Sequence, residues 1–252
     1  MRPREDPAQR LLLYNLCLDP AAAGSTEFID QEGNSAVRAW FAAPVKSLGI
    51  HSRFQVETRR ANPFDFLLEG LERVPAAYPE ALQPVLCAYT EGPPSGAVEE
   101  FARAAAQEAG GGTLEFLRIL NRRIFDSLRY RIRDHGRPLA AGQTLQAGEG
   151  SCRDFAVLFA EACRTMRLAA RFVSGYDTAA ADGDRADMHA WAEVYLPGGG
   201  WRGYDPSRAL AVGDSYVAVA ASLTPELAAP VTGSHGGNGG SVMETAIRLT
   251  VE

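Results

Sequence analysis

The sequence predicts an α+β protein in which an antiparallel β module precedes a larger domain of helices and strands. The first observation is that residues 10–56 form short β-like runs separated by turn residues. The second is that apolar residues then recur at helical spacing. The third is a return to β alternation near residue 170. We therefore divide the chain into an N-terminal antiparallel β module (1–60), a proline-rich linker (61–94) and a core domain with a C-terminal strand (95–252).

Composition excludes several classes of protein. The chain has 252 residues and a formal net charge of −6 at pH 7, so no general positive field attracts nucleic acid. The apolar run at residues 11–18 is interrupted by Asn15, is too short to span a bilayer and lacks the basic start of a signal peptide. We expect a cytoplasmic protein with neither nucleic acid nor membrane as a partner.

Metal and disulfide sites are not indicated by the cysteine pattern. The four cysteines include no Cys-x-x-Cys pair, so neither a zinc cage nor a disulfide framework is predicted. The acidic loop at residues 179–187 lacks the glutamate that a calcium loop requires at its twelfth position, and we interpret it as a solvated rim. We expect no metal and no cofactor.

The N-terminal module is predicted to contain strands joined by a tight turn. Residues 31–34, Gln-Glu-Gly-Asn, separate two β-like runs, and Gly33 is free to take a positive φ. This pattern predicts a hairpin. The following segment, 61–94, contains several prolines and is predicted to be irregular.

Three helices are predicted after the linker. Ser95 can cap the first, and the glycines at 110–112 end it. Thr113 is the expected N-cap of the second, which runs to about Leu128. The third, 154–166, is apolar over most of its circumference, which is typical of a buried central helix.

Strands are predicted to follow. The runs "ARFVSGYD", "MHAWAEVYLP" and "GWRGYDPSRA" each have β character, and "METAIRLTVE" is expected to form a final strand. In the second run, His189, Trp191, Glu193 and Tyr195 share one face, and Ala190, Ala192 and Val194 share the other.

A cysteine at the start of the buried helix raises the possibility of thiol chemistry. Cys152 lies where the helix dipole stabilises a thiolate, although a small buried residue is the alternative. His189 can act as base, and a hairpin can bring Asp205 beside it. Asp154 is interpreted as structural, because a nearby negative charge disfavours a thiolate. Spacing alone leaves these alternatives open.

The surrounding motifs resemble those of the transglutaminase-like superfamily of papain-like cysteine enzymes, in particular the bacterial cysteine protease type with an N-terminal β module. The G-x-C-x-D-F helix start, the H-A-W-x-E-V strand and the G-W-x-x-x-D-P strand are all present, and Ala169-Ala170-Arg171 replaces the usual Pro-Ala-Arg. The resemblance implies a papain-like domain with Cys152 as nucleophile, His189 as general base and acid, and Asp205 as the orienting carboxylate.

The resemblance also reaches the N-terminal module. Arg2-Pro3-Arg4…Gln9 and the turn Asp30–Asn34 match the "L-x-P-R…Q" and "D-x-x-G-N" segments of such proteins. Those relatives usually carry another strand before this point, so the module is expected to lack its first strand. An exposed sheet edge then predicts self-association through the module.

Three aromatic residues each have two possible interpretations, a role at the site or packing in the interior. Tyr130 matches the approximate place of an oxyanion-hole donor, with a core aromatic as the alternative. Trp191 and Trp201 line a substrate cleft in one interpretation and pack in the interior in the other.

The expected function is acyl transfer on amide or peptide bonds of a protein or peptide substrate. Cys152 attacks a carboxamide to form a thioester, and water or an amine then resolves it. Hydrolysis by a peptidase or amidase is the favoured outcome. The alternatives are a protein-glutamine transglutaminase and a non-catalytic binding or scaffold protein on the same fold.

Overall fold

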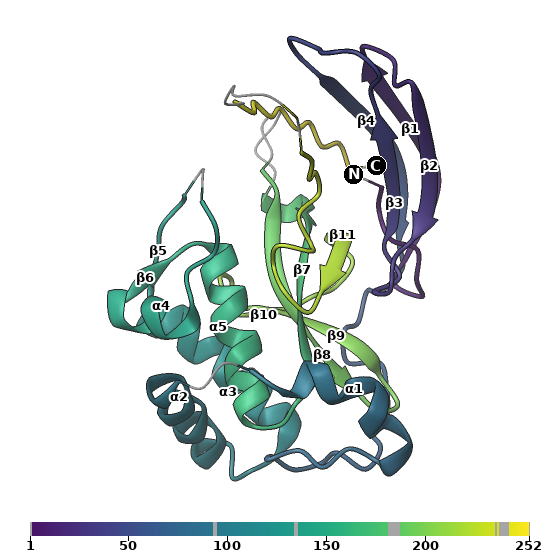
Figure 1. Ribbon diagram of the computed structural model, residues 1–252. Helices are drawn as coiled ribbons and strands as arrows, with labels where there is room; N and C mark the ends of the chain where they lie inside the picture. Colours follow the sequence, from purple (N-terminus) through teal and green to yellow (C-terminus); the bar gives the residue numbers. More distant parts are fainter. Residues whose placement is uncertain are drawn as a thin grey trace.

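The computed structural model describes residues 2–92, 95–133, 136–180, 187–234, 236 and 242–251. It has the predicted α+β architecture (Figure 1). A five-stranded antiparallel sheet has the strand order β10-β9-β8-β7-β11. The long helix α5 packs against this sheet, and the N-terminal module lies at the far side, beyond β11.

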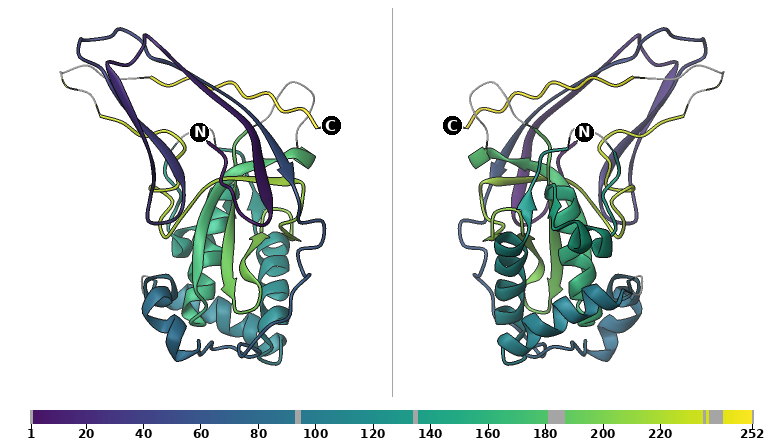
Figure 2. Two further views of the ribbon diagram at one scale, coloured as in Figure 1. Left: turned by 90° about the vertical axis from the view of Figure 1, so that its right-hand side faces the viewer. Right: turned by 90° about the vertical axis from the view of Figure 1, so that its left-hand side faces the viewer.

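The N-terminal module consists of two antiparallel strand pairs. β1 (Gln9–Asp19) pairs with β4 (Gly49–Thr58), and β2 (Gly24–Ile29) pairs with β3 (Ser35–Trp40). Gly33 has φ of 77° in the turn between β2 and β3, which confirms the predicted hairpin. In Figure 2 the module rises on the side away from α2 and α3.

Side chains of the module attach it to the outer edge of β11. Gln9 donates from Nε2 to the Ala218 carbonyl (2.8 Å) and accepts from the Ala218 N–H (2.7 Å). Asn34 makes the same pair of hydrogen bonds with Ala221, at 2.8 and 2.9 Å. The Arg4 N–H also donates to the Ala218 carbonyl (3.0 Å). The two amides thus supply the edge strand with hydrogen bonds that a neighbouring strand would otherwise provide.

The α-helices pack together around α5. They are α1 (Gln83–Thr90), α2 (Gly96–Glu108), α3 (Thr113–Ser127), α4 (Ala141–Ala147) and α5 (Cys152–Thr165), and η1 (Glu80–Leu82) and η2 (Thr178–Ala180) are short 3-10 turns. α2, α3 and α5 confirm the three predicted helices, except that Gly112, not Thr113, is the N-cap of α3.

The prediction that residues 61–94 form an irregular linker is wrong in one respect, since this segment contains α1. Its residues Leu71, Val74, Ala76 and Tyr78 are also buried in the main core. Prolines flank these residues and break regular periodicity. The apolar side chains nevertheless cover the core without repeating at helical or β spacing.

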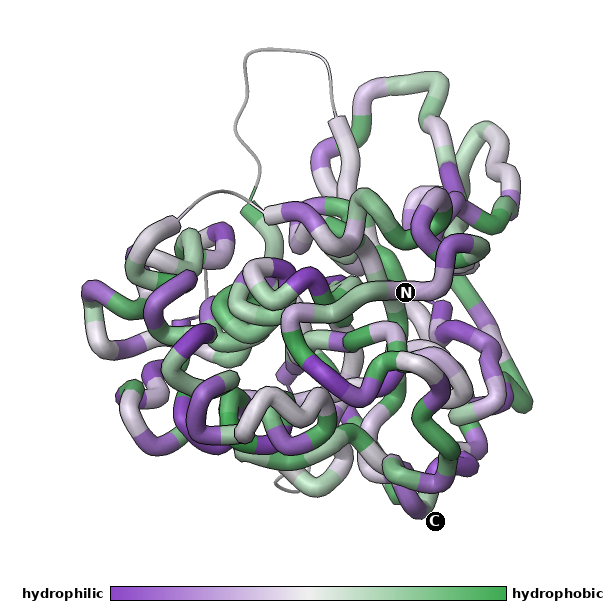
Figure 3. The backbone as a smooth tube through the Cα atoms, turned by 90° about the horizontal axis from the view of Figure 1, so that it is seen from below, coloured by the Kyte–Doolittle hydropathy of each residue, from purple (hydrophilic) through white to green (hydrophobic). Residues whose placement is uncertain are grey.

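Helix α5 is buried around most of its surface, as predicted. Phe155, Leu158 and Phe159 are at most 1% exposed, and each such side chain contributes roughly 1.5–3 kcal/mol on burial. Apolar and polar residues alternate over short intervals along the chain, as Figure 3 shows. Among the described residues, no helix is long and apolar enough to cross a membrane.

The sheet confirms the predicted alternation along β8 (His189–Leu196). Ala192 and Val194 belong to the core around α5, whereas Trp191 packs in a separate cluster on the opposite face. The neighbouring strands are β7 (Ala170–Asp177) and β9 (Gly200–Asp205). A Cβ at Gly175 would lie 2.1 Å from the Val217 carbonyl oxygen, so the close approach of β7 and β11 requires glycine there.

Two features of the C-terminal part differ from the prediction. The predicted strand at 243–252 is wrong, because described residues 242–251 adopt no regular secondary structure. Ile247 and Leu249 pack instead beside Val217 and Val219 of β11. The sheet is completed by β11 (Tyr216–Ser222) and the short β10 (Leu210–Ala211), which the sequence did not predict.

Candidate active site

Cys152 is the first residue of α5 and is 9% exposed. Asp154 anchors the turn that carries it: its Oδ2 accepts hydrogen bonds from the N–H (2.7 Å) and hydroxyl (2.8 Å) of Ser151. Its Oδ1 accepts from the Leu139 N–H and from Arg133 Nη2, both at 2.7 Å. These four bonds support the structural interpretation of Asp154, because they fix the helix start on which the thiol stands.

His189 and Asp205 lie side by side at the ends of two neighbouring interior strands of the sheet. His189 begins β8 and Asp205 ends β9, and the register places Tyr204 opposite Ala192. Asp205 is thus a diagonal neighbour of His189 on the same face. Nε2 of His189 lies 2.6 Å from Oδ2 of Asp205, which is a short, charge-assisted hydrogen bond.

Asp205 is fully buried, and its carboxylate is saturated with donors. Ser207 donates to Oδ1 from its N–H (2.9 Å) and its hydroxyl (2.7 Å), and Tyr216 donates its hydroxyl to Oδ2 (2.9 Å). Burial raises the pKa of Asp205, but His189, Ser207 and Tyr216 outweigh burial and hold that pKa below its usual value. Asp205 is therefore a carboxylate at neutral pH.

His189 contacts Cys152 as well as Asp205. Burial lowers the pKa of His189, but hydrogen bonds with Asp205 and Cys152, and the charges of both, raise it to about 10. Because Nε2 is engaged by Asp205, Nδ1 is the ring nitrogen left for the thiol. An imidazolium beside the sulfur favours the thiolate form of a cysteine.

Tyr130 also lies beside Cys152. It belongs to β5 (Arg129–Tyr130), which pairs in parallel with β6 (Glu149–Gly150). Burial raises the pKa of the Tyr130 hydroxyl, and the neighbouring Cys152 raises it further through its charge and a hydrogen bond. With 47% of its surface exposed, Tyr130 is not a core aromatic, so that reading is wrong. The hydroxyl stays protonated and can donate.

The tryptophans do not line a cleft at Cys152. Trp191 is 1% exposed, and its ring packs 5.3 Å from that of Tyr216, so the substrate-cleft reading is wrong for it. Trp201 pairs with Tyr195, six residues along β8 from His189, which is about 20 Å at the rise of a strand. Trp201 is therefore too remote to contact a group bound at the thiol.

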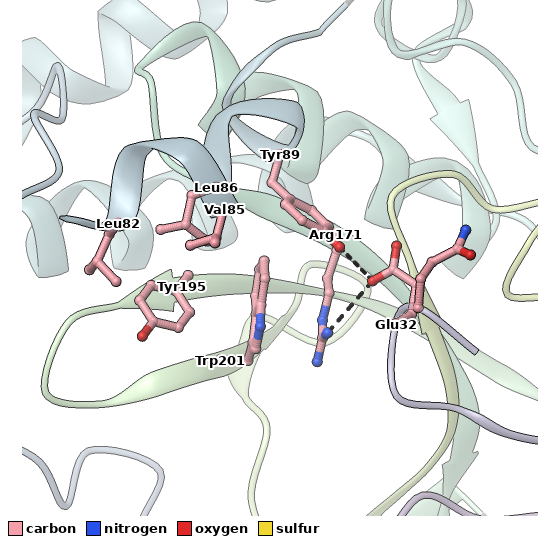
Figure 4. A pocket seen from close by; sticks show the side chains of 9 residues that line it. Glu32, Leu82, Val85, Leu86, Tyr89, Arg171, Tyr195 and Trp201 are labelled. Atoms are coloured by element: carbon pink, nitrogen blue, oxygen red, sulfur yellow. Dashed lines mark hydrogen bonds and ion pairs between the residues drawn. The ribbon is translucent and has the colours of Figure 1, made fainter. Parts of the chain in front are cut away.

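Trp201 lines a different pocket, of about 290 Å³, between α1, the sheet and the turn after β2 (Figure 4). Three of its polar side chains, Glu32, Tyr89 and Arg171, take part in hydrogen bonds and ion pairs. Tyr89 donates to Glu32 Oε2 (2.7 Å), Arg171 Nη2 lies 2.7 Å from Glu193, and the Arg171 guanidinium stacks 4.2 Å from the Trp201 ring centroid. These contacts connect Glu32, in the turn after β2, to α1 through Tyr89 and to the sheet through Arg171.

Asp177 completes a cluster of possible metal ligands with His189 and Asp205, whose ligand atoms lie within 4.8 Å of one another. Arg208 Nε, however, lies 2.8 Å from Asp177 Oδ2, and Asp205 is already saturated by the donors described above. A cation would compete with this guanidinium and with the imidazolium of His189. The cluster fits an ion-pair network and does not fit a metal site.

Sequence reasoning missed two residues of the site, Ser207 and Tyr216. Ser207 follows Asp205-Pro206, and an aspartate side chain commonly accepts a hydrogen bond from the backbone two residues further on in a turn, so that position offered a signal. Tyr216 comes from the unpredicted strand β11, and its contact with Asp205 depends on the tertiary fold. The predicted rim at 179–187 lies mostly outside the described residues, which lack 181–186.

Two protein-family models match the two parts of the chain. The model of the transglutaminase-like superfamily matches residues 99–206, and that of the bacterial transglutaminase-like N-terminal region matches residues 1–57. An uncharacterized protein of Mycobacterium tuberculosis is 30% identical over 237 residues, covering 87% of this chain and 74% of the relative. An uncharacterized protein of Mycobacterium leprae is 26% identical over 261 residues, covering 99% and 90%.

A solved structure shares the fold. The crystal structure of a "putative cysteine protease" from Cytophaga hutchinsonii has a TM-score of 0.70 with 22% identity, and covers 91% of this chain and 76% of that one. The likeness extends over both the N-terminal module and the core, and it carries information about fold alone.

Proposed function

This chain belongs to the transglutaminase-like superfamily, and we propose that it is a cysteine-dependent acyl-transfer enzyme acting on amide or peptide bonds. The observation that carries the proposal is the position of His189, which contacts Cys152 and bonds through Nε2 to the buried carboxylate of Asp205. This is the order of nucleophile, base and orienting group that activates a thiol.

The geometry supports the following sequence of steps. The Cys152 thiolate attacks the carbonyl carbon of a carboxamide, forming the C–S bond and placing negative charge on the carbonyl oxygen. The Cys152 N–H and the Tyr130 hydroxyl are the proposed donors to this oxygen. When the C–N bond breaks, His189 gives the Nδ1 proton to the departing amine, and a thioester remains.

We propose that water resolves the thioester. His189, now neutral, takes a proton from the water as it attacks, and the carboxylic acid leaves as the Cys152 thiolate re-forms beside the imidazolium. If a primary amine attacks instead, the product is a new amide, as in a transglutaminase. We retain the expected cytoplasmic location, a protein or peptide substrate and the absence of nucleic-acid and membrane partners as proposals.

The test offers the protein a glutamine-rich, unfolded substrate such as casein, with and without a fluorescent primary amine. Hydrolysis releases ammonia or new peptide ends in both mixtures, and transamidation requires the amine and labels the casein. Cys152→Ala is the control and should abolish either product. An intact-mass increase on Cys152 after rapid acid quenching would identify the thioester.

Absence of any product has a defined meaning. If casein and a broad peptide mixture give no product, and no mass increase on Cys152 is found, the scaffold alternative replaces the enzymatic proposal. A product that survives in Cys152→Ala would contradict the assigned nucleophile.

A further inference from the structure

Tyr216 is placed against both members of the His189–Asp205 pair. Its hydroxyl donates to Oδ2 of Asp205 at 2.9 Å, and the same oxygen accepts from His189 Nε2 at 2.6 Å. Its ring lies 6.2 Å from that of His189 and 5.3 Å from that of Trp191, measured between centroids. Tyr216 is 5% exposed, so neighbouring groups fix both its ring and its hydroxyl.

The backbone that carries Tyr216 is also fixed. Tyr216 pairs with Asp177 of β7, and the preceding carbonyl of Ser215 accepts from the N–H (2.8 Å) and the hydroxyl (2.9 Å) of Thr178. Two residues further on, Ala218 is held by both amide atoms of Gln9 in the N-terminal module. The tyrosine hydroxyl therefore has a defined position before any substrate binds.

We propose that Tyr216 is a positioning residue: it holds the Asp205 carboxylate so that Oδ2 faces Nε2 of His189, which leaves Nδ1 directed at Cys152. The inference rests on the proposed function in that Cys152 is taken as the nucleophile. Ser207 engages only Oδ1 of Asp205. Without the tyrosine hydroxyl, the hydrogen bond to His189 is the one other described contact that holds Oδ2.

A positioning role differs from a packing role in its effect on pH dependence. The titratable and charged groups around Asp205 are His189 on β8, Tyr216 on β11, Cys152 on α5, Tyr130 on β5, Asp177 on β7 and Arg208 in the turn after β9. Tyr216→Phe keeps the ring and removes one donor to the carboxylate. Since hydrogen-bond donors favour the charged form of a carboxylate, Asp205 should become protonated at a higher pH in the variant than in wild type.

The experiment measures the rate of Cys152 alkylation by iodoacetamide from pH 3.5 to 10, with peptide mass spectrometry, in wild type and Tyr216→Phe. We expect the acid-side midpoint of labelling to rise by about one pH unit, and the rate at pH 7 to change little because Asp205 stays ionised there. The matched control is Tyr89→Phe, which removes a hydroxyl bonded to Glu32 at 2.7 Å and should leave the profile unchanged. Circular dichroism at each pH confirms that both variants remain folded.

The outcomes separate the two proposals. A Tyr216→Phe profile that coincides with wild type, including one accompanied by a lower melting temperature, would show a packing role and overturn the inference while the proposed function stands. If wild-type Cys152 is not labelled selectively, the proposed function fails, and the positioning role fails with it.

Discussion

The imidazole of His189 and the carboxylate of Asp205 form a partly buried hydrogen bond of 2.6 Å between two neighbouring strands. His189 and Asp205 are not directly opposite each other in the strand register, and the Asp205 side chain reaches diagonally along the face of β8. The carboxylate is 0% exposed, so its charge acts on the imidazole through protein instead of water. This pair determines the expected chemistry of Cys152.

Replacing His189 by alanine should remove the enhanced reactivity of Cys152. Because the pKa of His189 is raised to about 10, the imidazolium persists at neutral pH beside Cys152. An ordinary thiol, with a pKa of about 8.5, is about 1% ionised at pH 6.5, so labelling there should fall up to about 100-fold in His189→Ala. Exposed Cys17 and Cys87 serve as internal references, and equal labelling of all three in wild type would contradict the ion pair.

Asp205→Asn should destabilise the protein in a pH-dependent way. His189 has a raised pKa, so its contribution to stability is complete below about pH 6.5 and is lost as pH rises through about 10. Asp205 has a lowered pKa, so its contribution is present above about pH 4 and is lost as pH falls. Urea unfolding should show that the free energy of unfolding of Asp205→Asn is about 3 kcal/mol lower than that of wild type near pH 5.5. This difference should shrink above pH 10. A constant difference across this range would argue against the assigned pKa shifts.

Asp154→Ala should destabilise the fold strongly. The carboxylate is fully buried and accepts four hydrogen bonds, and its removal also takes away the ion-pair partner of Arg133, so we expect a loss of about 3–5 kcal/mol in the free energy of unfolding. Glu149→Gln is a suitable control, because its ion pair with Arg131 is partly exposed and should contribute less than about 1 kcal/mol. Similar losses in the two variants would contradict the structural role of Asp154.

The N-terminal module should support self-association at high protein concentration. Ile29 is 69% exposed on β2 and Trp40 is 51% exposed on β3, and β2 and β3 form a sheet of two strands with open edges. In sedimentation velocity, the sedimentation coefficient should increase with protein concentration, and Ile29→Lys should reduce this increase. A monomer at every concentration would exclude this prediction.

The predictability of the fold depended on how local its signals were. The hairpin around Gly33 and helix α5 follow from turn chemistry and apolar spacing, which are properties of a few consecutive residues. The core role of residues 61–94 could not be predicted, because their apolar side chains repeat at no regular spacing and are buried by distant elements. The expected strand at 243–252 had the right pattern, yet none of its described residues pairs with a neighbouring strand.

The candidate site shows the same division. Cys152, His189 and Asp205 were chosen from motifs, and the structure brings the three together. Tyr130 lies beside Cys152, but the sequence could not distinguish this from a core position. Trp191 packs against Tyr216, a residue whose strand was not predicted.

The amide contacts between the module and β11 bear on how the protein can be divided for expression. A chain shortened to begin after Thr58 would retain every residue proposed for catalysis. It would also lose Gln9 and Asn34, and the peptide groups of Ala218 and Ala221 that these side chains satisfy would face solvent along an apolar strand. The boundary between the two family matches is therefore a boundary in sequence only, and a recombinant core without its first 58 residues should be recovered in inclusion bodies.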